Sequence, residues 1–356
     1  MQSREMATST LPPLPLPEYQ EGKSTIDTLE NVMDKVLIVL YTLTIILGIT
    51  GNSVVIWVAG FRLPSTVTSV WLVNLAVADL IFCLTRVVSL AKKLFFSYWP
   101  FGVFLCKFNG FFKYANMFCS VFLLGVISVD RALCVWRPVL TKQRRTLGVA
   151  RLVSVGVWVA SVTLSSPYFA FRQTYTSKNN LTKCSMEGKD RQGDVSSSLA
   201  LYILRFLCGF LLPFLVILCC YTLAAVGIRR TRLTRKRKPL KILASLVCAF
   251  FLCWAPYHCL LLVKMVNSKS QVVKIGVPLA KGFAYFNSCV NPLLYFFMGL
   301  DFRRRFQQGL SEVYRNALAE VEGPTAQSDE GQEKSSASTT QAREAVNSSA
   351  VNVAAL

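Results

Sequence analysis

One carboxylate, Asp79, lies in the middle of a long apolar stretch, where an ionisable side chain is costly and usually serves a function. Amide and hydroxyl side chains recur at a spacing of four in two other apolar stretches, as Asn116 with Ser120 and as Asn287 with Asn291. If these stretches are helices, the members of each pair share a face. A carboxylate surrounded by such oxygen atoms could hold Na⁺ or ordered water. The alternative is that Asp79 only pairs with a neighbouring helix.

Basic side chains occupy matching helical faces. Arg86 follows Asp79 by seven residues and Lys113 precedes Ser120 by seven, so each should point into the same interior. Several cations around one cavity, with no acid from the helices to pair them, would repel one another at low dielectric constant. They therefore imply an anionic ligand, such as a carboxylate held by an arginine fork.

Further residues complete the predicted ligand site. Arg205 lies about two turns above Pro213, and Lys281 precedes Tyr285 on the same helical face. Long basic side chains also reach the lipid headgroups without binding a ligand, and this alternative suits Arg172 better than the deeper arginines. The predicted ligand-binding set is Arg86, Lys113, Tyr114, Arg172, Arg205, Tyr257 and Lys281.

The elements that must position these residues are membrane-spanning helices. Apolar residues make up 53% of the 356 residues and charged residues 16%, against about 25% charged residues in soluble domains. A spanning helix needs about 20 mostly apolar residues. Seven stretches qualify, roughly 36–60, 68–91, 103–127, 149–171, 199–226, 240–263 and 275–298. We therefore predict an all-α membrane protein, a bundle of seven transmembrane helices, and the composition argues against a soluble enzyme.

The distribution of Lys and Arg predicts the orientation. The formal net charge is +20, and basic residues cluster in 137–145, 229–238 and 303–305, after the third, fifth and seventh stretches. Short cytoplasmic loops carry such an excess. We therefore expect a multi-pass plasma-membrane protein with an extracellular N-terminus. The charge needs no nucleic-acid partner to explain it.

Most of the twelve cysteines lie inside apolar stretches, where a thiol behaves as a small apolar group. Cys106 and Cys184 fall at extracellular ends, so we predict a disulfide that joins the third helix to the second outer loop. The same loop contains Asn180-Leu181-Thr182, a glycosylation sequon on the correct side of the membrane.

Composition divides the chain into four regions. We expect 1–34 to be a disordered extracellular tail and 35–299 to be the seven-helix domain. In 300–313, Phe302, Phe306 and Leu310 recur every four residues among arginines, which predicts a short amphipathic helix on the membrane surface. Residues 314–356 are rich in Ser, Thr, Gln and Glu, which predicts a disordered cytoplasmic tail.

Short motifs in every predicted helix resemble those of the rhodopsin-like (class A) G-protein-coupled receptors, over residues 35–313. They are Gly51-Asn52, Leu75-Ala-Val-Ala-Asp79, Asp130-Arg131, Trp158, Pro213 with Tyr221, Phe250 with Cys253-Trp254-Ala-Pro256, and Asn291-Pro292-Leu-Leu-Tyr295. Narrower segments, among them Trp99-Pro-Phe-Gly102 and Arg205-Phe-Leu-Cys-Gly-Phe-Leu211, resemble the chemoattractant cluster, nearest to the formyl peptide and chemerin receptors.

The resemblance implies a two-state switch without covalent chemistry, so the protein is not expected to be an enzyme. An outer ligand would repack Trp254 and swing the sixth helix about Pro256, which would free Arg131 to meet a heterotrimeric G protein of the inhibitory class. Receptor kinases and arrestin are the other expected cytoplasmic partners, besides membrane lipids. The implied switch comprises Asp130, Arg131, Phe250, Trp254, Pro256, Asn291, Pro292 and Tyr295.

The sequence departs from the family pattern in several places. Ala132 stands where an aromatic residue or Cys usually follows Asp-Arg, which leaves basal activity open. Val87 replaces a common proline, Tyr114 stands where formyl peptide receptors have an acid, and no cysteine follows the juxtamembrane helix.

We therefore predict a chemoattractant-type receptor for a ligand with an anionic group, either a peptide carboxylate or an acidic lipid mediator, that drives leukocyte chemotaxis and inflammatory responses. No cofactor or metal is expected except Na⁺ as an allosteric ion. Lys113, at the position of the aminergic aspartate, argues against an amine ligand, and Tyr285, at the retinal lysine position, argues against a photoreceptor. Two alternatives are a scavenger receptor that recruits arrestin without G-protein signalling and a seven-helix transporter. No internal repeat or path of acids supports the transporter.

Overall fold

The computed structural model describes residues 17–177, 179–186, 195–231, 237–267 and 270–298, together with 304, 306–309, 311–312 and 315. It divides into two units, Met1–Arg303 and Arg304–Leu356.

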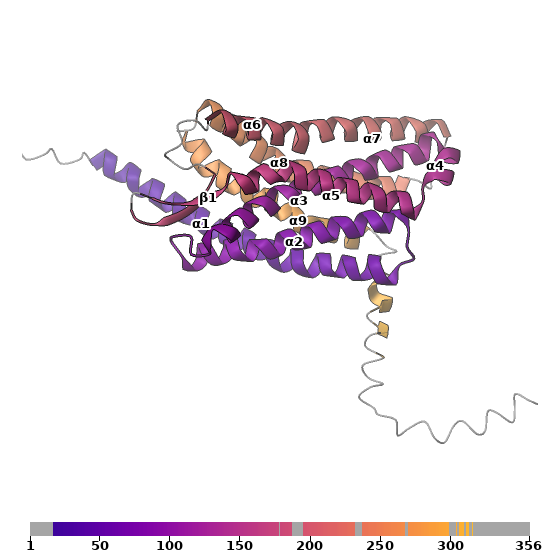
Figure 1. Ribbon diagram of the computed structural model, residues 1–356, viewed down its shortest axis with the longest axis horizontal. Coiled ribbons are helices and arrows are strands. Elements are labelled where there is room, and N and C mark those ends of the chain that lie inside the picture. Colours follow the sequence, from indigo (N-terminus) through magenta and orange to yellow (C-terminus); the bar gives the residue numbers. More distant parts are fainter. Residues whose placement is uncertain are drawn as a thin grey trace, which may run out of the picture. The chain divides into compact units, whose positions relative to one another are not determined.

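The first unit is built from long helices that run side by side (Figure 1). In chain order the elements are α1 (Pro17–Trp57) with the π-helical turn η1 (Val58–Arg62), α2 (Val67–Phe95), α3 (Gly102–Trp136), α4 (Pro138–Arg144), α5 (Leu147–Ala170), β1 (Gln173–Thr176), β2 (Thr182–Ser185), α6 (Val195–Phe206) with the π-helical turn η2 (Leu207–Leu211), α7 (Leu212–Thr231), α8 (Arg237–Val266) and α9 (Gln271–Met298).

The seven predicted segments each fall within one of these helical passes, the fourth to within one residue, with α6, η2 and α7 together forming the fifth. Six of the described helices are long and apolar enough to cross a membrane: Asn31–Arg62, Val67–Phe95, Gly102–Trp136, Leu147–Ala170, Leu199–Ile228 and Ala244–Val266. The seventh, α9, has 28 residues, but its sequence includes Lys274, Lys281 and two asparagines. The predicted all-α helical bundle is confirmed.

Helix α1 extends further than the sequence suggested, because it begins at Pro17 and includes residues 17–34, which were expected to form a disordered tail. Proline favours the first helical position, and the acids Glu18 and Glu21 favour the positive end of the helix dipole. Asp34 in this extension pairs with Lys93 of α2 at 2.7 Å. The rest of the predicted tail, residues 1–16, lies outside the described residues.

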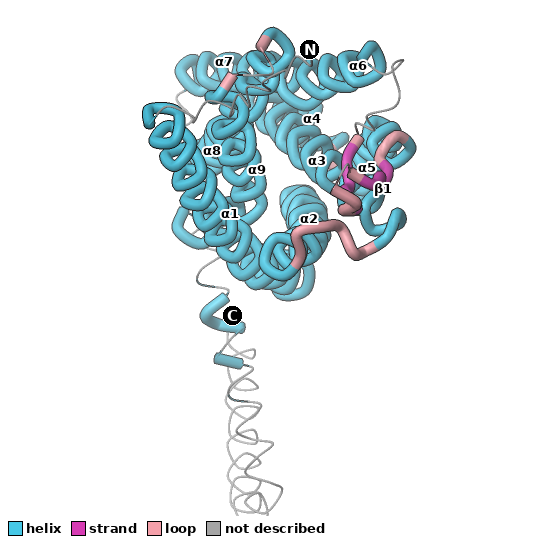
Figure 2. The backbone as a smooth tube through the Cα atoms, turned by 90° about the vertical axis from the view of Figure 1, so that its left-hand side faces the viewer, coloured by secondary structure: helices cyan, strands magenta, loops and turns pink. Residues whose placement is uncertain are grey.

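Helix α3 is the centre of the bundle, because it contacts α2, α5, α7 and α8 (Figure 2). Every residue from Lys113 to Val121 is buried, so this part of α3 is enclosed on all sides. A helix enclosed in this way normally carries apolar residues all round. The polar residues Lys113, Asn116 and Ser120 are therefore exceptions that need partners inside the bundle.

A two-stranded hairpin lies at one end of α3. Strand β1 pairs antiparallel with β2, with Thr174 opposite Cys184, and Cys184 forms a disulfide with Cys106 across a Cα–Cα distance of 5.8 Å. The predicted disulfide is therefore confirmed. The sequon residue Asn180 is exposed in the turn between the strands, with a φ of 56°, a left-handed conformation that asparagine tolerates well.

The described residues of the second unit at 304, 306–309, 311–312 and 315 are helical, within and just after the predicted amphipathic segment 300–313. Arg304 is exposed and Phe306 is half-buried. Phe302 and Leu310 lie outside the described residues, as does the predicted tail 314–356 apart from Arg315.

Replacing Cys106 and Cys184 together by Ser should lower the stability of the protein by about 2–4 kcal/mol, because the disulfide restricts the unfolded chain. Thermal unfolding of the purified protein in detergent measures this loss. Cys248→Ser, which changes an exposed free cysteine, is the control and should leave the midpoint unchanged. An unchanged midpoint in the double variant would contradict the stabilising role of the disulfide.

Candidate functional site

The carboxylate of Asp79 is fully buried and joins two other helices. The side-chain amide of Asn116 on α3 donates to one of its oxygens at 2.8 Å, and that of Asn291 on α9 donates to the other at 2.8 Å. Ser120 lies beside the same carboxylate. Four of the five residues predicted to form an oxygen-rich site therefore meet around one carboxylate.

The fifth predicted member, Asn287, is also buried, and its side-chain oxygen has no hydrogen-bond partner within the described part of the chain. Ser288, which the sequence analysis did not assign to this set, donates to the Asn116 side-chain oxygen at 3.2 Å. The backbone oxygen of Ser288 accepts from Asn52 at 2.9 Å, which ties α1 to α9. Ser288 lies three residues before Asn291 and so shares its helical face, but this spacing alone does not indicate that Ser288 joins the set.

A cavity of about 400 Å³ opens at the end of the bundle that carries the disulfide. Its basic lining residues are Arg86, Lys92, Lys93, Lys113, Arg172, Lys183 and Lys281. Among the described residues that line it, none is Asp or Glu. Asp34 of α1 pairs with Lys93 and its side chain is 62% exposed. It therefore offsets the charge of Lys93 near the opening.

Arg86 is only 3% exposed and is held by neutral groups. Its guanidinium donates to the backbone oxygen of Asn109 at 3.1 Å and to the Asn109 side-chain oxygen. It also lies over the rings of Phe82 and Tyr285, at 4.7 Å and 4.9 Å from the ring centroids. The sequence pattern placed Arg86 in the interior but did not identify Asn109 as its partner.

Lys113 and Arg205 lie deeper and share two tyrosine hydroxyls. The Lys113 ammonium donates to Tyr257 at 3.0 Å. The Arg205 guanidinium donates to Tyr114 at 2.9 Å and to Tyr257 at 3.4 Å. Lys113 and Arg205 are 7% and 2% exposed. Two buried cations thus meet at neutral phenols, and no carboxylate contacts either cation among the described residues.

The two remaining members of the predicted ligand set lie at the cavity wall. Arg172 is half-buried, packs against Gly110 of α3 and directs its Nε to the Cys184 sulfur at 3.2 Å. Lys281 lies with its ammonium 5.6 Å from the centroid of the Tyr285 ring. Arg86, Lys113, Arg172 and Lys281 thus line one cavity. Tyr114, Arg205 and Tyr257 do not line it and are connected to it through Lys113, which donates to both tyrosine hydroxyls.

A column of aromatic rings leads from this cluster toward the middle of the bundle. The Trp254 ring centroid lies 6.0 Å from that of Tyr257 above it and 6.0 Å from that of Phe250 below it. All three side chains belong to α8 and are buried. The three rings therefore form one continuous column of neighbours along α8.

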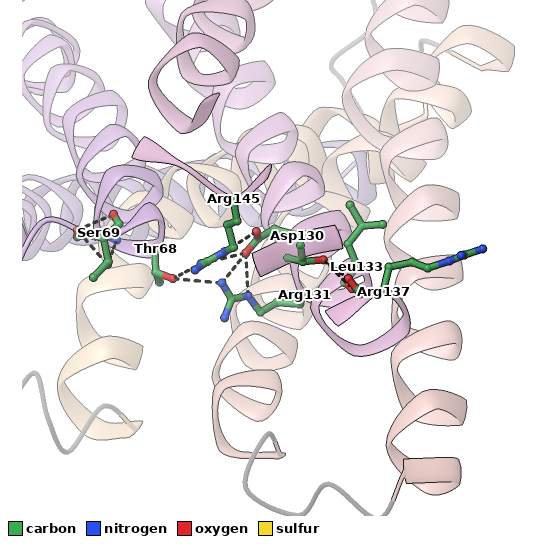
Figure 3. A network of polar contacts seen from close by, with 9 residues as sticks. Thr68, Ser69, Asp130, Arg131, Leu133, Arg137 and Arg145 are labelled. Carbon is green, nitrogen blue, oxygen red and sulfur yellow. Dashed lines mark hydrogen bonds and ion pairs between the residues drawn. The ribbon is translucent and has the colours of Figure 1, made fainter. Parts of the chain in front are cut away.

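Asp130 at the other end of α3 is the centre of a second polar network (Figure 3). It forms ion pairs with its neighbour Arg131 and, at 2.8 Å, with Arg145. Both arginines also donate to the Thr68 hydroxyl of α2, at 3.1 Å and 3.0 Å. The predicted contact between Asp130 and Arg131 is present. Arg145 was expected only as part of the basic loop 137–145, and Thr68 was not expected to take part.

The other predicted switch residues are prolines and a tyrosine. Pro256 lies inside α8 and Pro292 inside α9, where each removes a backbone hydrogen bond and permits a bend. Pro292 also packs against Gly51 of α1, where a side chain larger than hydrogen would collide with the proline ring. The side chain of Tyr295 lies outside the described residues.

Comparison with known proteins identifies the relatives of this chain. The family model described as "7 transmembrane receptor (rhodopsin family)" matches residues 51–295. A chemerin-like receptor 1 of Rattus norvegicus is 38% identical over 331 residues, which cover 86% of this chain and 89% of the relative. A formyl peptide receptor 2 of Mus musculus is 37% identical, covering 85% of this chain and 90% of the relative. A C3a anaphylatoxin chemotactic receptor of Danio rerio is 40% identical, covering 80% and 77%.

Replacing Lys113 by Met should stabilise the protein without ligand, because it removes a buried cation that Arg205 repels and that, among the described residues, only neutral groups contact. Substitution of a buried ion by an apolar side chain of similar size gains on the order of 1–4 kcal/mol where the ion is poorly compensated. Thermal unfolding in detergent measures the gain, with Lys107→Met on the same helix as the control. A lower midpoint for Lys113→Met would mean that its contacts with the phenols outweigh the repulsion.

Proposed function

This chain belongs to the rhodopsin family of seven-transmembrane receptors, and we propose that it is a cell-surface chemoattractant receptor that binds an anionic ligand in the basic cavity. Members of this family are membrane-embedded receptors that act through G proteins and are not enzymes. The finer proposal is a ligand with a carboxylate, from a peptide or an acidic lipid mediator, and an inhibitory G protein that drives leukocyte migration.

The observation that carries the ligand class is the absence of acids around Lys113 and Arg205 within the described part of the chain. Among the described residues, both donate hydrogen bonds to the hydroxyls of Tyr114 and Tyr257 and otherwise contact only aromatic rings. A phenol satisfies an N–H geometrically but does not neutralise its charge, whereas a carboxylate does both. An anion that enters the cavity would therefore meet Lys113 in its lining and, behind Tyr257, Arg205.

A carboxylate at this point would act on helix α8 through Tyr257. Binding between Lys113 and Arg205 competes with the two hydrogen bonds that hold the Tyr257 hydroxyl. Displacement of Tyr257 repacks Trp254 beneath it, and α8 can bend at Pro256. The ligand shifts the conformational equilibrium only by its difference in affinity between the two states.

At the opposite end of the bundle, the network around Asp130 would hold the resting state. Arg131 is engaged by Asp130 and Thr68, and its release would expose a guanidinium to a G protein. We assign this end to the cytoplasm and the hairpin end to the outside, because the basic loops 137–145 and 229–238 flank the former. Asn180 then lies in the compartment where its sequon can be glycosylated.

We further propose that the oxygen-rich set around Asp79 binds Na⁺. Asp79 and the side-chain oxygens of Asn116, Ser120, Ser288 and Asn287 supply the kind of ligands that hard cations prefer. The ion would favour the conformation in which α2, α3 and α9 converge on the carboxylate.

The scavenger alternative rests on Ala132, which is buried beside Arg131 in place of the usual aromatic residue or Cys. Inhibition of cAMP formation and recruitment of arrestin in transfected cells separate the two functions. The ligand panel holds formylated peptides, a chemerin-type C-terminal peptide with its C-terminal amide, and acidic lipid mediators. Both responses to an acid and neither to its amide would support the proposal, and arrestin recruitment alone would support a scavenger. No response to any anionic ligand would refute the proposed ligand class.

Arg205→Ala should reduce the potency of the active acid by about 30-fold or more, the range found when one partner of a buried charge pair is removed. The amide or ester of the same ligand should lose little, because it presents no charge to the arginine. Concentration–response curves for both ligands measure the difference, with Lys107→Ala as a control outside the cavity lining. Equal losses for acid and amide would refute carboxylate pairing.

Asp79→Asn should abolish the Na⁺ sensitivity of agonist binding and of thermal stability, because the variant lacks the only charged group in the set. Agonist affinity and unfolding midpoints are compared in NaCl and in choline chloride. Asp34→Asn, which neutralises an exposed carboxylate, should retain the wild-type difference between the salts. A Na⁺ effect that persists in Asp79→Asn would remove the ion site.

A further inference from the structure

A groove of about 750 Å³, much larger than the basic cavity, lies between α3, α5 and α7, on a different side of α3. Most of its lining is apolar and includes Phe122, Val153, Leu212 and Val216. None of its lining residues also lines the basic cavity. The groove is therefore separate from the proposed ligand site, although one end of it reaches Asp130 and Arg145 of the cytoplasmic network.

The length of the groove corresponds to one leaflet of a membrane. Along α3 it extends from Val121 to Leu133, which is about 18 Å at the rise of an α-helix. Half the hydrocarbon core of a bilayer measures about 15 Å. A single acyl chain that enters from one leaflet fits this depth, whereas a ligand that spans the bilayer does not.

The polar lining residues gather at one end of the groove, next to α4. They are Asp130, Thr141, Arg144, Arg145 and Thr146. Arg145 is already paired with Asp130 and bonded to Thr68. Arg144 is exposed and its side chain forms no ion pair or hydrogen bond with any residue that the structure describes. The groove is thus apolar along most of its length, and at one end it has Arg144, whose side chain forms no ion pair or hydrogen bond with the described residues.

We propose that this groove is a binding site for an anionic phospholipid, with one acyl chain between α3, α5 and α7 and the phosphate at Arg144. The argument for the charge of the occupant is complementarity, since Arg144 is a free donor where the headgroup would lie. Anionic phospholipids are concentrated in the cytoplasmic leaflet, and Arg144 lies on the end assigned to the cytoplasm. The choice of leaflet rests on the proposed orientation, whereas binding itself does not.

Gly125 of α3 provides a way to close the groove. It lines the groove, and a methyl group added there would meet no atom within 4 Å. Gly125→Leu therefore directs a branched apolar side chain into the space for the acyl chain from a position where the added Cβ itself meets no neighbour. Gly156 of α5 also faces open space but does not line the groove, so Gly156→Leu is a matched control.

The experiment uses the full chain in detergent, incubated with phosphatidylserine or with phosphatidylcholine of the same acyl composition, and native mass spectrometry of the retained lipid. We expect selective retention of phosphatidylserine. Arg144→Ala should weaken it by about five-fold, the effect of one basic residue beside an anionic headgroup. Lys142→Ala, a second exposed cation of α4 that does not line the groove, should leave retention unchanged.

Gly125→Leu should abolish retention of phosphatidylserine while Gly156→Leu preserves it, and unfolding midpoints show whether each variant is folded. Equal retention of both phospholipids, or loss in both α4 variants alike, would overturn the proposal, as would retention of an added fatty acid or sterol in preference to phosphatidylserine. The assay needs no agonist or G protein. Failure of the lipid-retention assay would therefore not contradict the proposed receptor function. Likewise, a lack of response to the agonist panel would not contradict the lipid site.

Discussion

Lipid offers no hydrogen bonds, so each polar group within the bilayer must find its partner in the protein, and this requirement fixes how the helices meet. Asp79 draws α3 and α9 together through Asn116 and Asn291. Asn52 ties α1 to the backbone of Ser288 in α9, and the Trp158 indole of α5 donates to Asn74 of α2 at 3.0 Å. The apolar side chains around these contacts could pack in many registers, whereas each polar contact permits only one.

The outer half of the bundle meets the same requirement only in part. Its buried cations have hydrogen-bond acceptors and aromatic faces, which satisfy geometry, but no counter-charge among the described residues. Desolvation of a cation is repaid fully only by an opposite charge. The Asp79 carboxylate is likewise held by neutral amides, and the Asn287 oxygen beside it has no partner among the described residues. Each region therefore leaves free energy for an ion of opposite charge to gain.

The sequence predicted those features that depend on position along a single helix. Bilayer thickness sets the length of the apolar stretches, and helical periodicity placed Arg86, Lys113 and Asn116 in the interior. It could not predict partners that depend on how two elements approach, such as Asn109 for Arg86 or Thr68 for Arg145. Nor did it predict the start of α1 at Pro17, because the acids that made 17–34 look like a polar tail also favour a helix beyond the membrane.

The π-helical turn η2 makes the fifth helical pass tolerant of a change in residue count. A π turn contains one residue more than an α turn, yet each rotates the chain by one full circle. Loss of one residue from Leu207–Leu211 would therefore convert the π turn into an α turn and leave Arg205 on the face that it now occupies. A relative with one residue fewer in this turn can thus present the same charge to its cavity.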